Sequence, residues 1–150
     1  ALIDRISGDV RPDIHQLHGS ETVARSRDIA VRTGIDVMKV IKVREAADTA
    51  AAQVYVAPAG PCPMVLFDAK APPGAILPGG NGLAFDWRHL EGVPETVPYM
   101  LSGGLTPENV IDAIRLTRAR AVDVSSGVER APGEKDPERI RAFIAAAKSL

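Results

Sequence analysis

Short apolar segments alternate with helical patterns along the chain at intervals of about 30 residues, the length of a parallel βα unit. The expected strands span residues 14–19, 35–43, 64–67, 98–101 and 121–124. A helical pattern over residues 1–9 precedes them, and further helices are expected over 20–33, 44–56 and 86–91 and from 106 and 136 onward. Strands that are apolar throughout and separated by helices indicate an α/β fold with a parallel sheet, either open or closed into a barrel.

The expected helix starts rest on residues whose side chains cap helices. Ser20, Thr106 and Asp136 precede apolar periodic segments, and Pro107 and Pro137 stand at the first helical position. Side-chain oxygens at such positions accept hydrogen bonds from the first helical amides. We therefore expect three of the helices to begin directly after these capping residues.

Composition excludes several classes of protein. Lys and Arg number 18 against 19 Asp and Glu, so no general basic field exists to attract nucleic acid. No segment approaches the roughly 20 apolar residues that a bilayer span needs. The single cysteine, Cys62, excludes an internal disulfide and a multi-cysteine zinc site, which favours a reducing, cytoplasmic setting. No linker divides residues 1–150, and we expect a single domain.

Asp68 is the first candidate for chemistry because it directly follows the apolar segment 64–67. Ligands of parallel α/β folds bind at the carboxyl ends of strands. The glycine-rich segment 69–85 follows it, and a long loop inside a compact domain is usually functional. We expect this loop to close over Asp68 and desolvate it. The structural alternative is a carboxylate that only caps a helix or orders the loop.

Two turns of small residues follow the last two expected strands and are candidates for phosphate binding. The turns are Ser102-Gly103-Gly104 and Ser125-Ser126-Gly127. Backbone amides approach a phosphate closely only where side chains do not obstruct them. A side chain added at Gly104 or Gly127 is therefore expected to weaken phosphate binding. Each turn alone is also consistent with a plain βα connection.

Three further polar residues lie on or beside expected strands. Gln16 and His18 share one face of the first strand, whereas His15 points to the other, so the two histidines are a poor metal pair. Asp123 lies within the last expected strand and must be hydrogen-bonded or bind ligand if it is buried. Cys62 precedes its strand, at the end opposite the chemistry, and is expected to be inert. No metal site is expected.

Several motifs together resemble phosphoribosylanthranilate isomerase of tryptophan biosynthesis. They are QLHGSE (16–21), LFDAK (66–70), GGNGLAFDW (79–87), LSGGLTPENV (101–110), VDVSSGVE (122–129) and PGEKDPERI (132–140). Their order and spacing resemble the (βα)8 TIM barrel of this family from the end of its third helix to its C-terminus. The resemblance thus implies an incomplete barrel of about five βα units, strands 4 to 8, with exposed edges near Ile14 and Val122.

The resemblance implies an Amadori rearrangement of N-(5-phosphoribosyl)anthranilate that needs no cofactor. Asp68 would be the general acid, and Gly103, Gly104, Ser125, Ser126 and Gly127 would bind the phosphate. The remaining pocket residues would be Gln16, His18 and Asp123. The cysteine base and the anthranilate-binding arginine of the family belong to its first two strands, which have no counterpart here. The 150 residues alone are therefore expected to be inactive, with the N-terminal segment as a possible partner.

Two alternatives remain open. Indole-glycerol-phosphate synthase, another phosphate-binding barrel, uses lysine and glutamate at strand ends. Lys39 and Lys42 lie in or just after an expected strand, but the sequence indicates no matching glutamate on neighbouring strand ends. The second alternative is a catalytically dead half-barrel that binds phosphate and serves in assembly.

Overall fold

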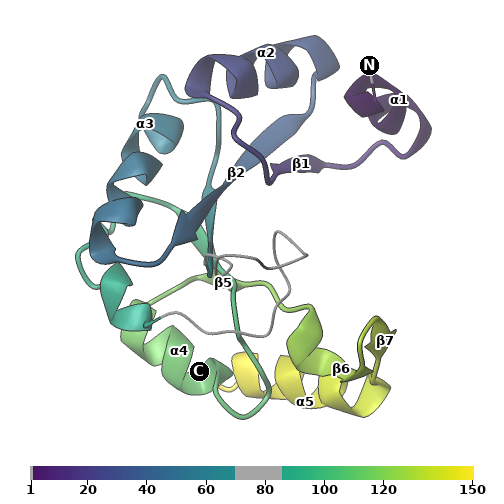
Figure 1. Cartoon of the computed structure of the whole chain (residues 1–150), viewed down its shortest axis with the longest axis vertical. Helices are drawn as coiled ribbons and strands as arrows, with labels where there is room; N and C mark the ends of the chain where they lie inside the picture. The colour runs from purple at the N-terminus through teal and green to yellow at the C-terminus, as the bar shows by residue number, and fades with distance from the viewer. Residues whose placement is uncertain (1, 70–85) are drawn as a thin grey trace.

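The computed structural model describes residues 2–69 and 86–150 and contains a parallel sheet of five strands. The strands are β1 (Ile14–Leu17), β2 (Asp36–Val43), β3 (Val65–Ala69), β4 (Tyr99–Leu101) and β5 (Ala121–Val122). Each strand pairs with the next one in sequence, so β1 and β5 form the two edges of the sheet. The elements follow an open arc with helices along its outside (Figure 1). The predicted α/β fold with a parallel sheet is confirmed.

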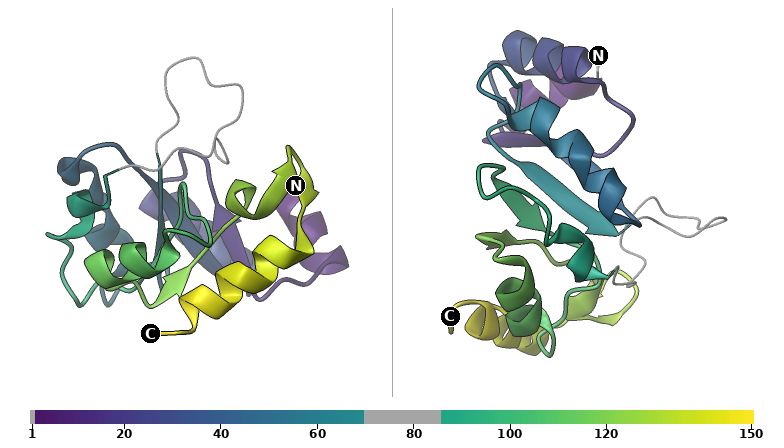
Figure 2. Two further views of the ribbon diagram at one scale, coloured as in Figure 1. Left: turned by 90° about the horizontal axis from the view of Figure 1, so that it is seen from below. Right: turned by 90° about the vertical axis from the view of Figure 1, so that its left-hand side faces the viewer.

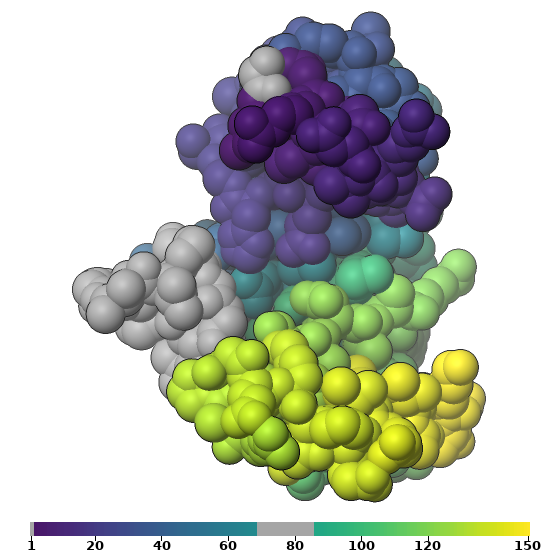
Figure 3. Space-filling view, turned by 90° about the vertical axis from the view of Figure 1, so that its right-hand side faces the viewer, coloured from purple at the N-terminus to yellow at the C-terminus, as the bar shows by residue number. Residues whose placement is uncertain are grey.

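Helical segments separate successive strands, as parallel pairing requires. Together with α1 before β1, and with η3 and α5 after β5, the helical segments are α1 (Leu2–Asp9), α2 (Val23–Thr33), η1 (Ala46–Ala51), α3 (Ala52–Val56), η2 (Trp87–Leu90), α4 (Val110–Thr117), η3 (Ser126–Val128) and α5 (Pro137–Ala147), where η marks a 3₁₀ helix. Figure 2 shows this arrangement from two further sides. The N-terminal and C-terminal parts lie at opposite ends of the molecule, with the middle of the chain between them (Figure 3).

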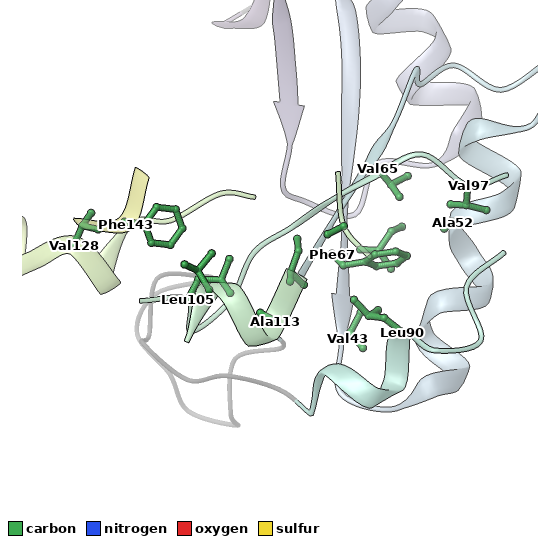
Figure 4. Close-up of a cluster of buried hydrophobic side chains, with 14 residues drawn as sticks. Val43, Ala52, Val65, Phe67, Leu90, Val97, Leu105, Ala113, Val128 and Phe143 are labelled. Atoms are coloured by element: carbon green, nitrogen blue, oxygen red, sulfur yellow. The ribbon is translucent and has the colours of Figure 1, made fainter. Parts of the chain in front are cut away.

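The main hydrophobic core lies between the helices and the outer face of the sheet. Val65 and Phe67 of β3 lie near Ala52 and Val97, and Phe143 of α5 lies near Val128 in another part of the same cluster (Figure 4). The ring of Phe67 meets that of Tyr99 edge to face, with centroids 5.1 Å apart. Because side chains alternate along a strand, the intervening residues project from the opposite, inner face. Met38, Val40 and Leu66 form a separate buried cluster on that face.

The structure corrects two of the three predicted helix starts. Helix α2 is capped by Thr22, whose Oγ1 accepts a hydrogen bond from the Arg25 amide at 3.2 Å, and Ser20 lies outside the helix. Helix α4 begins at Val110 and not directly after Thr106, because a turn comes first. Thr106 does cap that turn: its Oγ1 accepts from the Glu108 amide at 3.3 Å, and its own amide donates to Asn109 Oδ1 at 2.8 Å. The prediction for Asp136 is confirmed, with Pro137 at the start of α5.

Two other local expectations differ from the structure. The helix predicted over residues 44–56 is divided, because the Asp48 carboxylate accepts from the Arg44 and Glu45 amides and starts a 3₁₀ segment. A small antiparallel hairpin, β6 (Glu129–Ala131) with β7 (Glu134–Lys135), was not predicted; Gly133 supplies its positive φ of 81°. Apart from Ala69, the glycine-rich loop predicted to close over Asp68 lies outside the described residues.

Candidate active site

A lateral row of polar residues crosses the inner face at the carboxyl ends of the strands. Lys42 of β2 is in register with Asp68 of β3. Ser102 and Asp123 extend this row, because each directly follows a residue of the registered pair Leu101 and Val122. The ladder also continues through them: Ser102 N donates to Phe67 O and Asp123 N donates to Leu101 O, both at 2.8 Å. Four strands therefore place polar side chains side by side.

Asp68 is the most deeply buried member of this row. Its exposure is 6%, and its Oδ2 lies 3.9 Å from Lys42 Nζ and 3.5 Å from His18 Nε2. His18 directly follows β1 and reaches Asp68 across the end of β2. A buried carboxylate requires such partners, because an uncompensated charge is costly to desolvate. The predicted neighbourhood of Asp68 and His18 is thus present, and Lys42 is a member that sequence reasoning did not assign to it.

Asp123 lies one residue beyond the end of β5, so its placement within the last strand was wrong. Val122 is the last residue of the strand in register with β4. The side chain is hydrogen-bonded, as expected: Ser102 Oγ donates to Asp123 Oδ2 at 3.0 Å. This contact joins the ends of β4 and β5 beside Asp68.

The two turns of small residues meet beside this row. A Cβ atom at Gly127 would lie only 1.8 Å from the carbonyl oxygen of Leu105, so the second turn packs directly against the backbone that follows the first. Gly103 and Gly104 have φ values of 89° and 69°, which glycine adopts without strain. Close packing therefore explains the glycine in the second turn, and positive φ values explain the two glycines in the first.

Side chains from neighbouring elements hold the carbonyl groups of both turns. Asn109 Nδ2 donates to Gly104 O at 3.0 Å, and Arg139 Nε donates to Gly127 O at 3.1 Å. Lys135 Nζ donates to both the carbonyl and the hydroxyl oxygen of Ser125 at 3.0 Å. These bonds fix the peptide planes, and therefore the directions of the amides, in the two turns. Lys135 lies on β7, in the hairpin that was not predicted from the sequence.

The side chains of β1 alternate between the two faces of the sheet, as predicted. Gln16 is exposed and in register with Met38, which places it on the inner face. His15 is buried on the other side, where Ser7 Oγ lies 2.8 Å from its Nε2. The prediction that the two histidines face apart is confirmed. Among the described residues, no three of His, Cys, Asp and Glu are grouped closely enough to hold a metal ion.

A lysine and a glutamate that sequence reasoning left unmatched are partners in the structure. Lys39 Nζ lies 3.0 Å from Glu21 Oε2, although 18 residues separate them in sequence. Burial raises the pKa of Glu21, but hydrogen bonds from Lys39 and from the Gly19 amide outweigh it and lower the pKa overall. Side chains along β2 alternate between the two faces of the sheet, so Lys39 projects from the outer face, whereas Val40 and Lys42 project from the inner face. The pair therefore lies on the opposite face from Asp68 and is not placed as a lysine–glutamate catalytic pair.

Cys62 precedes β3, at the end of the strand opposite Asp68, and is buried. Burial raises the pKa of its thiol, and a hydrogen bond from the Lys39 backbone only partly offsets this. A thiol that stays protonated is a poor base or nucleophile. Its predicted place, away from the site, is confirmed.

Replacing Cys62 by serine is expected to change kcat by less than about threefold, because acid–base groups normally contribute 10²–10⁴-fold. The hydroxyl is nearly isosteric and can keep the bond from the Lys39 amide. Steady-state kinetics in whichever form of the protein turns over measure the effect. A 100-fold loss without a matching loss of folded protein would place Cys62 in the reaction.

Comparison with known proteins agrees with this geometry. The family profile of N-(5'-phosphoribosyl)anthranilate isomerase matches residues 1–146. The chain belongs to this family. Curated isomerases of the same name are 56% identical over 147 residues in Paracoccus denitrificans and 54% identical over 149 residues in Bradyrhizobium diazoefficiens. These alignments include 98% and 99% of this chain, but 67% and 66% of the relatives.

Solved structures of the family share the fold. Phosphoribosyl anthranilate isomerase from Thermotoga maritima superimposes with a TM-score of 0.82 at 38% identity, covering 99% of this chain and 68% of that one. A second isomerase structure, in complex with reduced 1-(o-carboxyphenylamino)-1-deoxyribulose 5-phosphate, gives a TM-score of 0.79 at 36% identity, covering 99% and 66%. The chain thus spans about two thirds of the length of its relatives.

No helix among the described residues is long and apolar enough to cross a membrane.

Proposed function

We propose that this chain takes part in the isomerisation of N-(5-phosphoribosyl)anthranilate to 1-(2-carboxyphenylamino)-1-deoxyribulose 5-phosphate, a step of tryptophan biosynthesis. Membership of the isomerase family supports this assignment. The observation that carries it is the position of Asp68: a buried carboxylate between His18 and Lys42 on the inner face, at the carboxyl ends of parallel strands. The substrate is a phosphorylated small molecule, and the site lies beside two turns suited to phosphate.

Asp68 acts as the general acid in this proposal. It gives a proton to the furanose ring oxygen as the bond from that oxygen to C1 breaks, which leaves a Schiff base between C1 and the anthranilate nitrogen. A base then removes the C2 proton, and the electron pair of that bond forms a C1–C2 double bond while the C1=N pair returns to the protonated nitrogen. The resulting enolamine tautomerises to the ketone. Lys42 and His18 stabilise the carboxylate that remains on Asp68. Proton transfers alone balance these steps, so no cofactor is required.

The two turns bind the phosphate in this proposal. Amides around Gly103, Gly104, Ser126 and Gly127 donate to its oxygens, because the missing side chains allow close approach. Ser125 keeps the second turn in place through its two bonds from Lys135. Gln16 and Asp123, with His18, line the part of the inner face that receives the sugar and the anthranilate ring.

The base belongs to another part of the barrel in this proposal. The resemblance assigns it to a cysteine on the first strand of the family and assigns the anthranilate-binding arginine to the second strand, whereas this chain corresponds to strands 4 to 8. The two open edges of the described sheet, β1 and β5, are where the remaining strands would pair. We propose that residues 1–150 form one partial-barrel domain that gains activity when this N-terminal segment joins it.

Two forms of the protein test the proposal. The first is the 150-residue chain alone, and the second is the same chain preceded by the N-terminal third of the Paracoccus denitrificans isomerase. We expect the second form to turn over the phosphoribosylanthranilate substrate at least 100-fold faster, because it adds the base. Both forms should bind reduced 1-(o-carboxyphenylamino)-1-deoxyribulose 5-phosphate by calorimetry.

Ligand binding by both forms without turnover by either would favour the catalytically dead half-barrel that binds phosphate. Absence of both binding and turnover would contradict the proposal. Equal turnover of the two forms would show that the base lies within residues 1–150. In that second case, kinetics of the Cys62→Ser variant would test whether this thiol had taken the role.

A further inference from the structure

Lys39 is a charged side chain in a place where helices pack against a sheet. It lies on the outer face of β2 with an exposure of 5%, beside the apolar cluster of Leu17, Ile29, Val37 and Cys62. Its ammonium group has three acceptors within hydrogen-bonding distance: Gly19 O at 2.6 Å, Glu21 Oε2 at 3.0 Å and Leu17 O at 3.3 Å. An ammonium group has three donors, so this environment satisfies all of them.

The acceptors surround a short turn that contains His18. Leu17 and Gly19 are the residues on either side of it, and Lys39 holds the carbonyl of each. Glu21 closes the turn, because the same Oε2 also accepts from the Gly19 amide at 3.0 Å. Tyr55 on α3 donates to the Glu21 carbonyl at 2.8 Å and ties the turn to the outer helices.

His18 leaves this turn in the direction of the candidate active site. Its Nε2 lies 3.5 Å from Asp68 Oδ2, two strands away. Because peptide groups are planar, the bond from Lys39 to the Leu17 carbonyl fixes the peptide before His18, and the bond from the Gly19 amide to the Glu21 carboxylate, which Lys39 also holds, fixes the peptide after it. Together these bonds restrict the backbone of residue 18 and the origin of its side chain. The contact between His18 and Asp68 thus depends on bonds made on the opposite face of the sheet.

We propose that Lys39 is a positioning residue that holds His18 against Asp68 through the turn of residues 17–21. The inference rests on the proposed function only in so far as Asp68 is the general acid. Lys39 touches neither Asp68 nor the inner face, so it acts through His18.

The contacts of Lys39 favour this role over a purely stabilising one. Replacing a buried ion pair by apolar groups of similar volume is often neutral or even stabilising, because the charges are no longer desolvated. Stability alone therefore does not require a lysine at this position. What methionine cannot do is donate to two carbonyls and a carboxylate at once, and those bonds define the shape of the turn.

The test measures how far the NMR resonances of His18 shift when Asp68 is changed, and compares this response with and without Lys39. Imidazole resonances are recorded by NMR for the 150-residue chain, with His18→Gln to assign the signal. We expect Asp68→Asn to shift the His18 resonances clearly in the wild-type background. In the double variant Lys39→Met, Glu21→Gln, which leaves no unpaired charge, we expect that response to fall to less than one third. His15, buried on the other face, serves as the internal reference.

Two further variants separate positioning from loss of fold. Thr117→Val removes a buried hydroxyl that donates to Ala113 O at 2.7 Å, at the far end of the sheet, and should lower Tm while leaving the His18 response intact. Lys39→Arg retains a charge with several donors and should recover part of the response. If the Lys39→Met, Glu21→Gln variant does not fold, folded Lys39→Arg and Lys39→Gln variants are compared instead. The inference is refuted if the His18 response in Lys39→Arg is no larger than in Lys39→Gln.

The kinetic consequence is measured in the form that turns over. We expect Lys39→Met, Glu21→Gln to lower kcat at least tenfold with KM within about threefold, since phosphate contacts are unchanged. An unchanged His18 response in the folded double variant would overturn the inference. Failure of the wild-type chain to bind the reduced product analogue would instead count against the proposed function, since the NMR comparison needs no ligand.

Discussion

Replacing Asp68 by asparagine is expected to lower kcat at least 100-fold and to leave KM within about threefold. The amide has the shape of the carboxylic acid and can occupy the same space between His18 and Lys42, but it has no acidic proton for the ring oxygen. Substrate affinity depends mainly on the phosphate turns and the inner face, which the substitution leaves in place. Steady-state kinetics in the active form measure both constants.

Asp112→Asn is the matched control, because Asp112 is an exposed carboxylate on α4 and should keep normal kinetics. Thermal unfolding of both variants shows whether the change at Asp68 also affects the fold. Near-normal turnover of Asp68→Asn would move the acid to another group, and His18 is then the first to test. A rise in KM with unchanged kcat would make Asp68 a binding residue.

The strands and the place of Asp68 could be predicted because they depend on local pattern. Apolar segments such as Ile35 to Val43 are consistent with a strand covered on both faces, and a carboxylate that ends one of them must lie at the ligand-binding edge. The period of two also predicted that His15 and His18 would face apart. These statements follow from chain geometry that every parallel sheet shares.

Contacts between distant segments explain what could not be predicted. Ser20 has the chemistry of a cap, but Thr22 takes that role while Glu21 turns toward Lys39 and the Gly19 amide. No local pattern indicates that Lys39 projects to the outer face or that Glu21 meets it there. The same holds for Lys42, whose neighbourhood with Asp68 comes from the register of β2 and β3.

The packing of the two phosphate turns predicts a large effect at Gly127. A methyl group there would lie 1.8 Å from the Leu105 carbonyl oxygen and 3.2 Å from Val124 Cγ2, so backbone must move. We expect Gly127→Ala to cost about 3 kcal/mol or more in the free energy of unfolding, the upper range for overpacked sites. For a domain of this size, that corresponds to a fall in Tm of roughly 6–12 °C. Thermal unfolding of the 150-residue chain measures this cost.

The same substitution separates the turns, and with them the amides that would hold the phosphate from two sides. At a temperature where Gly127→Ala remains folded, KM in the active form should rise at least tenfold, equivalent to about 1.4 kcal/mol of binding. Gly92→Ala is the control, because an added Cβ meets nothing within 4 Å there, and both its Tm and its KM should stay near wild type. A Gly127→Ala variant that melts earlier but keeps its KM would show that this contact serves folding alone. The phosphate would then have to be bound elsewhere on the inner face, because a site made of both turns cannot keep its affinity when one of them moves.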